Sequence, residues 1–256
     1  MAIRGILLDL DGTIYWGQKE VAGASGFVRE QQEAGIRCLF VTNRSNRTPE
    51  RIRDQLGGYG IACETGDILT SGQATAQYIG SGKVYCVGED GLVAALEEAG
   101  LTVTDESAGF VVVSFDRFFT YDKMTTACRL IDGGARYIAT NPDRCLRTED
   151  GLVPGTGAIV ASVTAGCGID PVVIGKPERF IFDMAVKHLG MDYDQVIAVG
   201  DNLDTDIPAG HRAGIRTVLM LTGISSRDDL DGAAVKPTWV AENFAELSDI
   251  IKGDNR

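Results

Sequence analysis

The hydrophobic and polar positions form two kinds of segment that follow each other along the chain, short apolar runs and segments with helical signals. Short apolar runs predict buried strands over residues 3–9, 36–42 and 67–70. Each run is followed by a segment with helical periodicity or helix-start signals, over 22–34, from Thr48-Pro49 onwards and over 72–79. This order of strands and helices indicates parallel strands that are joined by helical crossovers.

A second series of elements begins after the flexible tripeptide Gly80-Ser81-Gly82. The pattern there predicts strands over 83–87, 110–115 and 136–140, and helices over 90–99, 121–133 and 155–166. The strand–helix pattern of the first 80 residues then resumes. It predicts strands over 172–174, 196–199 and 216–221 and helices over 178–189, 206–213 and 243–252. We therefore predict a split α/β core, residues 1–80 and 173–256, that carries an inserted α/β domain over residues 81–172.

Composition narrows the class of protein. The 256 residues include 44% hydrophobic and 23% charged side chains, which is ordinary for a soluble globular protein. The net charge of −12 argues against a nucleic-acid-binding surface, which needs a basic stripe. We see no charged-then-apolar leader and no apolar run of membrane-spanning length, and the six cysteines are scattered without a C-x-x-C pair. We therefore expect a cytoplasmic protein with reduced thiols and no membrane partner.

Two carboxylates end the first predicted strand. Asp9 and Asp11 are two residues apart, so their side chains lie on the same face of the strand at its C-terminal end. Ligands of open α/β sheets bind at that end. Two anions so close together need a compensating cation, and oxygen ligands favour Mg²⁺. The alternative is a strand that runs into an acidic turn at Gly12.

Further polar residues follow other core strands. Thr42 and Asn43 end the second strand, Lys176 follows the strand at 172–174, and Asp201 and Asp206 follow the strand at 196–199. Alone, each has an ordinary structural explanation, because a loop lysine is usually a solvated charge and a threonine at a strand end is usually a cap. Together and in this order, they converge on one edge of one sheet.

The residue types suggest phosphoryl chemistry. An ionised Asp9 can attack phosphorus and form an aspartyl-phosphate, while Asp11 can protonate the leaving oxygen and later activate water. Mg²⁺ and Lys176 would offset the crowded negative charge. Asp201 would complete the metal site, with Asp206 in or just outside the first shell of ligands. Thr42 and the backbone of Asn43 would hold phosphate oxygens.

These segments resemble the four motifs of the haloacid dehalogenase superfamily. The matching residues are Asp9-Leu10-Asp11-Gly12-Thr13, Thr42, Lys176 and Gly200-Asp201…Asp206. The position of the insert resembles the branch with a type-two (C2) cap. Within that branch, Val41-Thr42-Asn43, Thr140-Asn141-Pro142-Asp143 and the segment 200–207 resemble the NagD and para-nitrophenyl-phosphatase group, subfamily IIA. Asp204 departs from the pattern, because a basic residue is common at that place.

The resemblance implies a Rossmann-like parallel-sheet core and an Mg²⁺-dependent phosphatase. It implies that Asp9 is the nucleophile and Asp11 the acid/base. It also implies that the metal is held by the Asp9 carboxylate, the Asp11 backbone oxygen and Asp201. Dehalogenases lack an acid/base at the second position, because a halide needs no protonation, so Asp11 favours phosphoryl chemistry.

Substrate contacts are expected from both parts of the chain. We assign them to Gly12, Thr42, Asn43, Lys176 and Asn202 at the core motifs, and to Asp143 and Arg144 in the insert. The substrate would be a small phosphate ester, such as a nucleotide, a sugar phosphate or a para-nitrophenyl phosphate-like ester. Two other functions stay open, a phosphotransferase or mutase and a phosphorylatable signalling module. The resembled group also includes dimers formed through the cap, so a homodimer is one expectation.

Overall fold

The computed structural model describes residues 2–148 and 151–255, and the chain forms two compact units. The first, here the core unit, comprises Met1–Thr42, Pro49–Leu69 and Lys176–Arg256. The second, here the inserted unit, comprises Asn43–Thr48 and Thr70–Gly175. The short segment after Thr42 therefore belongs to the inserted unit. Each unit is built around its own sheet.

The core unit contains a six-stranded sheet in the order β15-β14-β13-β1-β4-β5. The pairs β1–β13, β1–β4, β13–β14 and β14–β15 are parallel. The strands are β1 (Gly5–Leu8), β4 (Arg37–Thr42), β5 (Ile68–Thr70), β13 (Val196–Gly200), β14 (Arg216–Met220) and β15 (Trp239–Ala241). The helices are α1 (Ala24–Glu33), α2 (Pro49–Gly58), α7 (Phe180–Leu189), α8 (Asp206–Ala213), α9 (Asp229–Gly232) and α10 (Phe244–Asp254). A hairpin of β2 (Tyr15–Trp16) and β3 (Lys19–Glu20) follows β1, and short 3₁₀ turns precede β5 and β13.

Helices cover both faces of the core sheet, which explains its continuous apolar strands. All four residues of β1 are buried, as expected for a parallel strand between two helical layers. Ile6 and Leu8 pack in one cluster with Phe27 of α1 and Phe244 of α10. Leu7 points the opposite way, to the face where α7 and α8 contact the sheet.

The strand order creates a switch point beside β1. The chain runs outwards from β1 through β4 to β5, and then restarts on the other side with β13, β14 and β15. In open α/β sheets, ligands bind outside the carboxyl ends of the strands at such a point. The segments that follow β1 and β13 are therefore where a site is expected.

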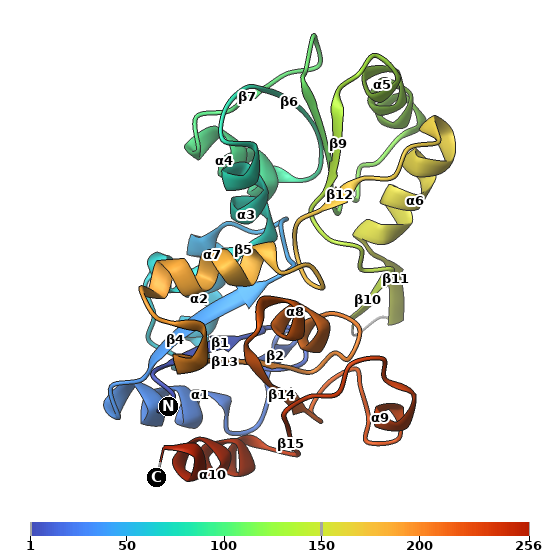
Figure 1. Ribbon diagram of the computed structural model, residues 1–256. Helices are drawn as coiled ribbons and strands as arrows, with labels where there is room; N and C mark the ends of the chain where they lie inside the picture. Colours follow the sequence, from blue (N-terminus) through green and yellow to red (C-terminus); the bar gives the residue numbers. More distant parts are fainter. Residues whose placement is uncertain (1, 149–150, 256) are drawn as a thin grey trace. The chain divides into compact units, whose positions relative to one another are not determined.

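The inserted unit contains a five-stranded sheet in the order β12-β9-β8-β6-β7, with parallel neighbours. Its strands are β6 (Lys83–Val87), β7 (Thr102–Val103), β8 (Phe110–Val113), β9 (Arg136–Ala139) and β12 (Val172–Val173). The antiparallel hairpin β10 (Cys145–Thr148) and β11 (Gly151–Pro154) follows β9. The helices are α3 (Ser71–Ile79), α4 (Asp90–Glu98), α5 (Tyr121–Asp132) and α6 (Thr156–Cys167) (Figure 1). α5 and α6 pack against each other and against β8.

The predicted α/β architecture is confirmed, but one strand was placed in the wrong sheet. The sequence analysis assigned residues 172–174 to the core, whereas β12 pairs with Ile138 and Ala139 of β9 in the inserted unit. A short apolar run shows that a strand is buried but not which sheet it joins. α3, which was also predicted to belong to the core, lies in the inserted unit too. The domain ranges 1–80, 81–172 and 173–256 stay a prediction.

Among the described residues, no helix is both long enough and apolar enough to cross a membrane.

Candidate active site

Two of the predicted site carboxylates leave adjacent strands at the switch point. Leu8 of β1 is in register with Val199 of β13, and the Asp9 N–H continues the ladder by donating to the Val199 carbonyl at 2.9 Å. Asp9 follows β1 directly, and Asp201 follows Gly200 at the end of β13. Parallel pairing therefore brings two residues that are far apart in sequence to the same edge.

A third carboxylate completes a buried acidic cluster. Asp206, the first residue of α8, is buried together with Asp9 and Asp201. Carboxylate oxygens of these three residues lie within 4.8 Å of one another. The Asn202 N–H donates to Asp206 Oδ2 at 3.2 Å and fixes its orientation. Gly200 is required here, because a Cβ at that position would collide with the Asp206 side chain.

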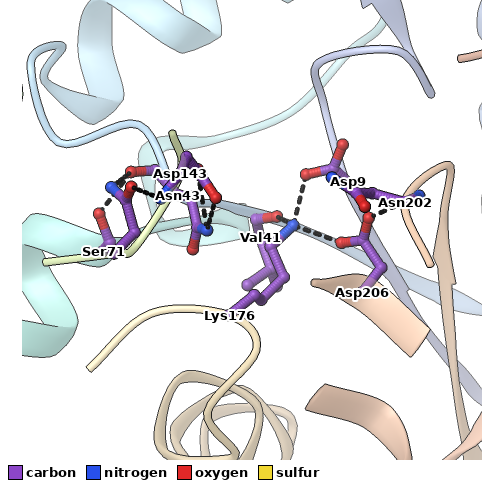
Figure 2. A network of polar contacts seen from close by, with 9 residues as sticks. Asp9, Val41, Asn43, Ser71, Asp143, Lys176, Asn202 and Asp206 are labelled. Atoms are coloured by element: carbon purple, nitrogen blue, oxygen red, sulfur yellow. Dashed lines mark hydrogen bonds and ion pairs between the residues drawn. The ribbon is translucent and has the colours of Figure 1, made fainter. Parts of the chain in front are cut away.

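Lys176 lies between two of these carboxylates. Its Nζ donates to Asp9 Oδ1 at 2.5 Å, to Asp206 Oδ1 at 2.6 Å and to the Val41 carbonyl at 3.2 Å (Figure 2). Only 3% of the Lys176 side chain is exposed. A buried ammonium is tolerated because every contact supplies an acceptor and two of them carry charge.

The electrostatics of the cluster favour a further cation. Burial raises the pKa of Asp9 well above its ordinary value, and Asp206, Asp201 and Asp11 add to this while Lys176 opposes it. Burial, and then Asp206, raise the pKa of Asp201 to about 7. Burial acts to lower the pKa of Lys176, but Asp206 and Asp9 outweigh it and the pKa is raised. One ammonium among three carboxylates leaves an excess of negative charge when all are ionised.

The donor set fits a divalent metal ion. Three buried carboxylates supply hard oxygen ligands, and a dication would balance the negative charge that Lys176 leaves. Asp9, Asp201 and Asp206 are therefore the described residues that could hold a metal.

The loop after β14 also contacts the acidic cluster, at Asp201, and the sequence analysis did not predict this contact. The Ile224 N–H donates to Asp201 Oδ2 at 2.6 Å, and Gly223 lies so close to that carboxylate that a Cβ would collide with it. The signal in the sequence was a glycine just after a predicted strand, which is too common to indicate a site by itself.

The first motif continues into a tight turn. Gly12 has φ of +88°, and its N–H donates to the Tyr15 carbonyl at 2.8 Å. A Cβ at Gly12 would collide with the Asp201 carboxylate, so glycine is needed both for the turn and for the close approach. Asp11 is half-buried and forms an isolated bridge with Tyr15.

Two further predicted residues have defined places in the core unit. Thr42 is buried at the end of β4. Asn202 uses its side-chain oxygen within the turn that precedes α8, where it accepts from the Asp204 N–H at 2.8 Å. Asn202 therefore shapes the backbone between Asp201 and Asp206.

In the inserted unit, the structure brings Asn43 and Asp143 together. The Asn43 amide donates to both carboxylate oxygens of Asp143, at 3.3 and 3.1 Å. The Asn43 carbonyl accepts from Ser71 Oγ at 2.6 Å and from Asn141 Nδ2 at 2.8 Å (Figure 2). Arg144 is exposed beside this pair in the sequence. Both members of the pair were predicted to contact substrate, but their contact with each other was not predicted.

Comparison with known proteins now defines the class. The family described as haloacid dehalogenase-like hydrolase matches residues 6–102, and a second, HAD-hydrolase-like family matches residues 173–247. Both carboxylate-bearing segments lie within these matches. The chain belongs to the haloacid dehalogenase-like hydrolases, as the motifs predicted.

Relatives place the chain in the NagD-like group. It is 42% identical over 247 residues to the 5′-nucleotidase YutF of Bacillus subtilis, covering 95% of this chain and 96% of that protein. It is 40% identical over 253 residues to an acid sugar phosphatase of Staphylococcus aureus, covering 97% and 96%. A solved p-nitrophenyl phosphatase of Archaeoglobus fulgidus has a TM-score of 0.92 at 35% identity, covering 99% of this chain and 100% of the other.

Proposed function

We propose that this protein is an Mg²⁺-dependent phosphomonoesterase that acts through an aspartyl-phosphate on Asp9. The observation that carries the proposal is the buried cluster of Asp9, Asp201 and Asp206 with Lys176 inside it. The cluster lies at the carboxyl edge of the core sheet, where a phosphate ester would meet the nucleophile. A metal ion that can be bound there supplies charge neutralisation for the phosphoryl group.

The substrate is a small phosphate ester. The relatives named above are a nucleotidase, a sugar phosphatase and a p-nitrophenyl phosphatase. We propose for this chain the same range of esters, with a nucleoside monophosphate or a sugar phosphate as the metabolite. The names of these relatives agree that the substrate is a phosphate ester and differ in its leaving group. The identity of the leaving group is therefore the question that the substrate panel below has to answer.

The first half of the reaction forms the covalent intermediate. An Asp9 carboxylate oxygen attacks phosphorus, and the bond between phosphorus and the ester oxygen breaks. Asp11 donates its proton to the departing oxygen, so the alcohol leaves neutral. Thr42 holds the phosphoryl oxygens, and the positive charge of Lys176 stabilises the charge that develops on them.

The second half returns the enzyme to its starting state. Asp11, now ionised, removes a proton from a water molecule that attacks phosphorus, and the bond to Asp9 breaks to release phosphate. Asp9, Asp201 and the Asp11 backbone oxygen would hold Mg²⁺, with Asp206 beside them. Lys176 would keep Asp206 and Asp9 oriented through both halves.

The remaining predicted contacts concern the leaving group and the phosphate. We propose that Asp143 and Arg144 of the inserted unit contact the leaving group, and that Gly12, Asn43 and Asn202 contribute near the phosphate. We also propose a cytoplasmic location and a homodimer formed through the inserted domain. Size-exclusion chromatography with light scattering tests the dimer.

Hydrolysis of a panel of phosphomonoesters, with Mg²⁺ and with a chelator, tests the function. We expect Mg²⁺-dependent release of phosphate, abolished in Asp9→Asn and retained in Asp194→Asn, whose side chain is exposed. Release in ¹⁸O-water should place one solvent oxygen in the phosphate. Transfer to a sugar without incorporation of solvent oxygen would indicate a phosphotransferase or mutase instead. Appreciable turnover by Asp9→Asn would exclude Asp9 as the nucleophile.

A further inference from the structure

The loop that follows β14, residues 222–225, touches both of the segments that carry the proposed metal ligands. Thr222 Oγ1 donates to the Gly12 carbonyl at 2.8 Å, on the turn directly after Asp11. The Ile224 N–H donates to Asp201 Oδ2 at 2.6 Å, and the Ser225 N–H donates to the Asp201 carbonyl at 3.1 Å. One loop therefore binds to the segment after β1 and to the segment after β13.

Ser225 is attached to the Asp201 segment at two points. Besides its N–H contact, its Oγ accepts from the Leu203 N–H at 2.9 Å. The Ser225 side chain is buried, and so is Leu203. The hydroxyl therefore fixes the backbone at Leu203, while the Ser225 N–H fixes the carbonyl of Asp201 itself. With the Ile224 contact, the loop makes three hydrogen bonds to the segment from Asp201 to Leu203, and one of them is to the Asp201 carboxylate.

The loop is itself anchored from the first motif. Trp16 Nε1, on β2, donates to the Thr222 carbonyl at 2.8 Å. Thr222 thus accepts from one residue of the β1–β2 segment and donates to another, Gly12. A change in the position of this loop would move Gly12 and Asp201 relative to each other.

We propose that Thr222 and Ser225 are positioning residues, which set the spacing between the Asp11–Gly12 turn and Asp201 and so determine metal affinity. The proposal rests on the proposed Mg²⁺ site. Each hydroxyl would act through the segment that it binds, Thr222 through Gly12 and Ser225 through Leu203. Outer-shell partners of this kind commonly change metal affinity by about 10–100-fold when they are removed.

The test measures Mg²⁺ affinity directly, by isothermal titration calorimetry on the full chain, in the wild type and in Ser225→Ala and Thr222→Val. We expect the Mg²⁺ dissociation constant to rise at least about tenfold in both variants. Ser225→Thr and Thr222→Ser keep the hydroxyl and should restore much of the affinity. Ser226→Ala is the matched control, because Ser226 is exposed and its hydroxyl contacts Asp229 instead.

Thermal unfolding of the metal-free chains separates positioning from stability. Unchanged Mg²⁺ affinity in folded Thr222→Val and folded Ser225→Ala would overturn the proposal, whatever the change in melting temperature. If Ser225→Ala does not fold, Thr222→Val together with its serine rescue decides the question. A wild-type chain that binds no Mg²⁺ would overturn the proposed function and this inference together, whereas a wild type that binds and variants that match it would overturn this inference alone.

Discussion

The Nζ of Lys176 lies 2.5 Å from Oδ1 of Asp9, although the two residues are 167 positions apart in the sequence. The same ammonium lies 2.6 Å from Asp206, so one buried cation links the proposed nucleophile to the acidic residue that begins α8. Held in this way, the Asp9 carboxylate keeps a fixed direction at the end of β1. Lys176 therefore orients the proposed nucleophile and offsets negative charge in the acidic cluster.

Replacing Lys176 should lower the catalytic activity more than replacing a surface lysine does. In Lys176→Met, we expect kcat for para-nitrophenyl phosphate to fall by about 100-fold or more, because the positive charge beside the proposed nucleophile is lost. The free energy of unfolding should fall by about 3–5 kcal/mol, because two buried carboxylates lose their partner. Steady-state kinetics and urea unfolding check both effects. Lys187→Met, on the exposed side of α7, is the control, and a kcat within threefold of the wild type would contradict the assigned role.

Metal binding should depend on pH in a direction set by Asp201. Its pKa in the folded chain is raised to about 7, whereas an unfolded aspartate has a pKa of about 3.9. The folded metal-free chain thus holds this proton more tightly than the unfolded chain does. The stability that the proton contributes is complete below about pH 4 and is lost as the pH rises through about 7.

Mg²⁺ must displace that proton, so its affinity should fall below pH 7. We expect the Mg²⁺ dissociation constant to be about 30-fold larger at pH 5.5 than at pH 8, because it rises about tenfold for each pH unit below the pKa of Asp201. Calorimetry in two buffers of different ionisation enthalpy should show release of about one proton or more at pH 5.5 and almost none at pH 8. Equal affinity at both pH values, without proton release, would contradict the raised pKa.

The sequence could place these residues at one edge of the sheet because they end parallel strands. Asp9, Thr42 and Asp201 each follow a short buried run, and the carboxyl ends of parallel strands share one edge. Residue type and order were therefore enough to group them. The turn at Gly12 was also recognisable, although its close approach to Asp201 was not, because that distance depends on how β1 and β13 pair.

Other features were beyond the reach of sequence patterns for physical reasons. The loop at 222–225 acts through backbone N–H groups and two hydroxyls, which have no distinctive residue signature. β12 was assigned to the wrong sheet, since two valines can pair equally well with either. The contact between Asn43 and Asp143 joins residues 100 positions apart, and both had been predicted only as separate contributors to substrate binding.

Gly12 allows a test that separates backbone strain from damage to the site. Gly12 and Gly35 have φ of +88° and +78°, but a Cβ at Gly35 would meet open space whereas a Cβ at Gly12 would collide with Asp201. Alanine in this region costs about 1–2 kcal/mol, so both Gly12→Ala and Gly35→Ala should lose stability. Only Gly12→Ala should raise the Mg²⁺ dissociation constant, by at least about tenfold. Similar Mg²⁺ affinity in the two variants would show that the close approach to Asp201 does not matter.

The paired Asn43 and Asp143 provide a test of leaving-group selection. The amide of Asn43 binds both oxygens of Asp143 and so orients this carboxylate, and carboxylate oxygens accept hydrogen bonds from hydroxyl groups. Sugar phosphates and nucleotides carry such hydroxyls, and para-nitrophenyl phosphate does not. We therefore expect Asp143→Ala to raise KM for a nucleoside monophosphate or a sugar phosphate by about tenfold, the equivalent of one charged hydrogen bond.

Kinetics on the two kinds of substrate distinguish recognition from a structural role. For Asp143→Ala, kcat/KM for para-nitrophenyl phosphate should stay within twofold of the wild type, because that ester lacks the group being recognised. Asp132→Ala, at the exposed end of α5, should change neither substrate's kinetics. Equal losses on both substrates would mean that Asp143 supports the fold of the inserted unit. No loss on either would remove it from the substrate site, and selection of the leaving group would then have to be sought at Arg144.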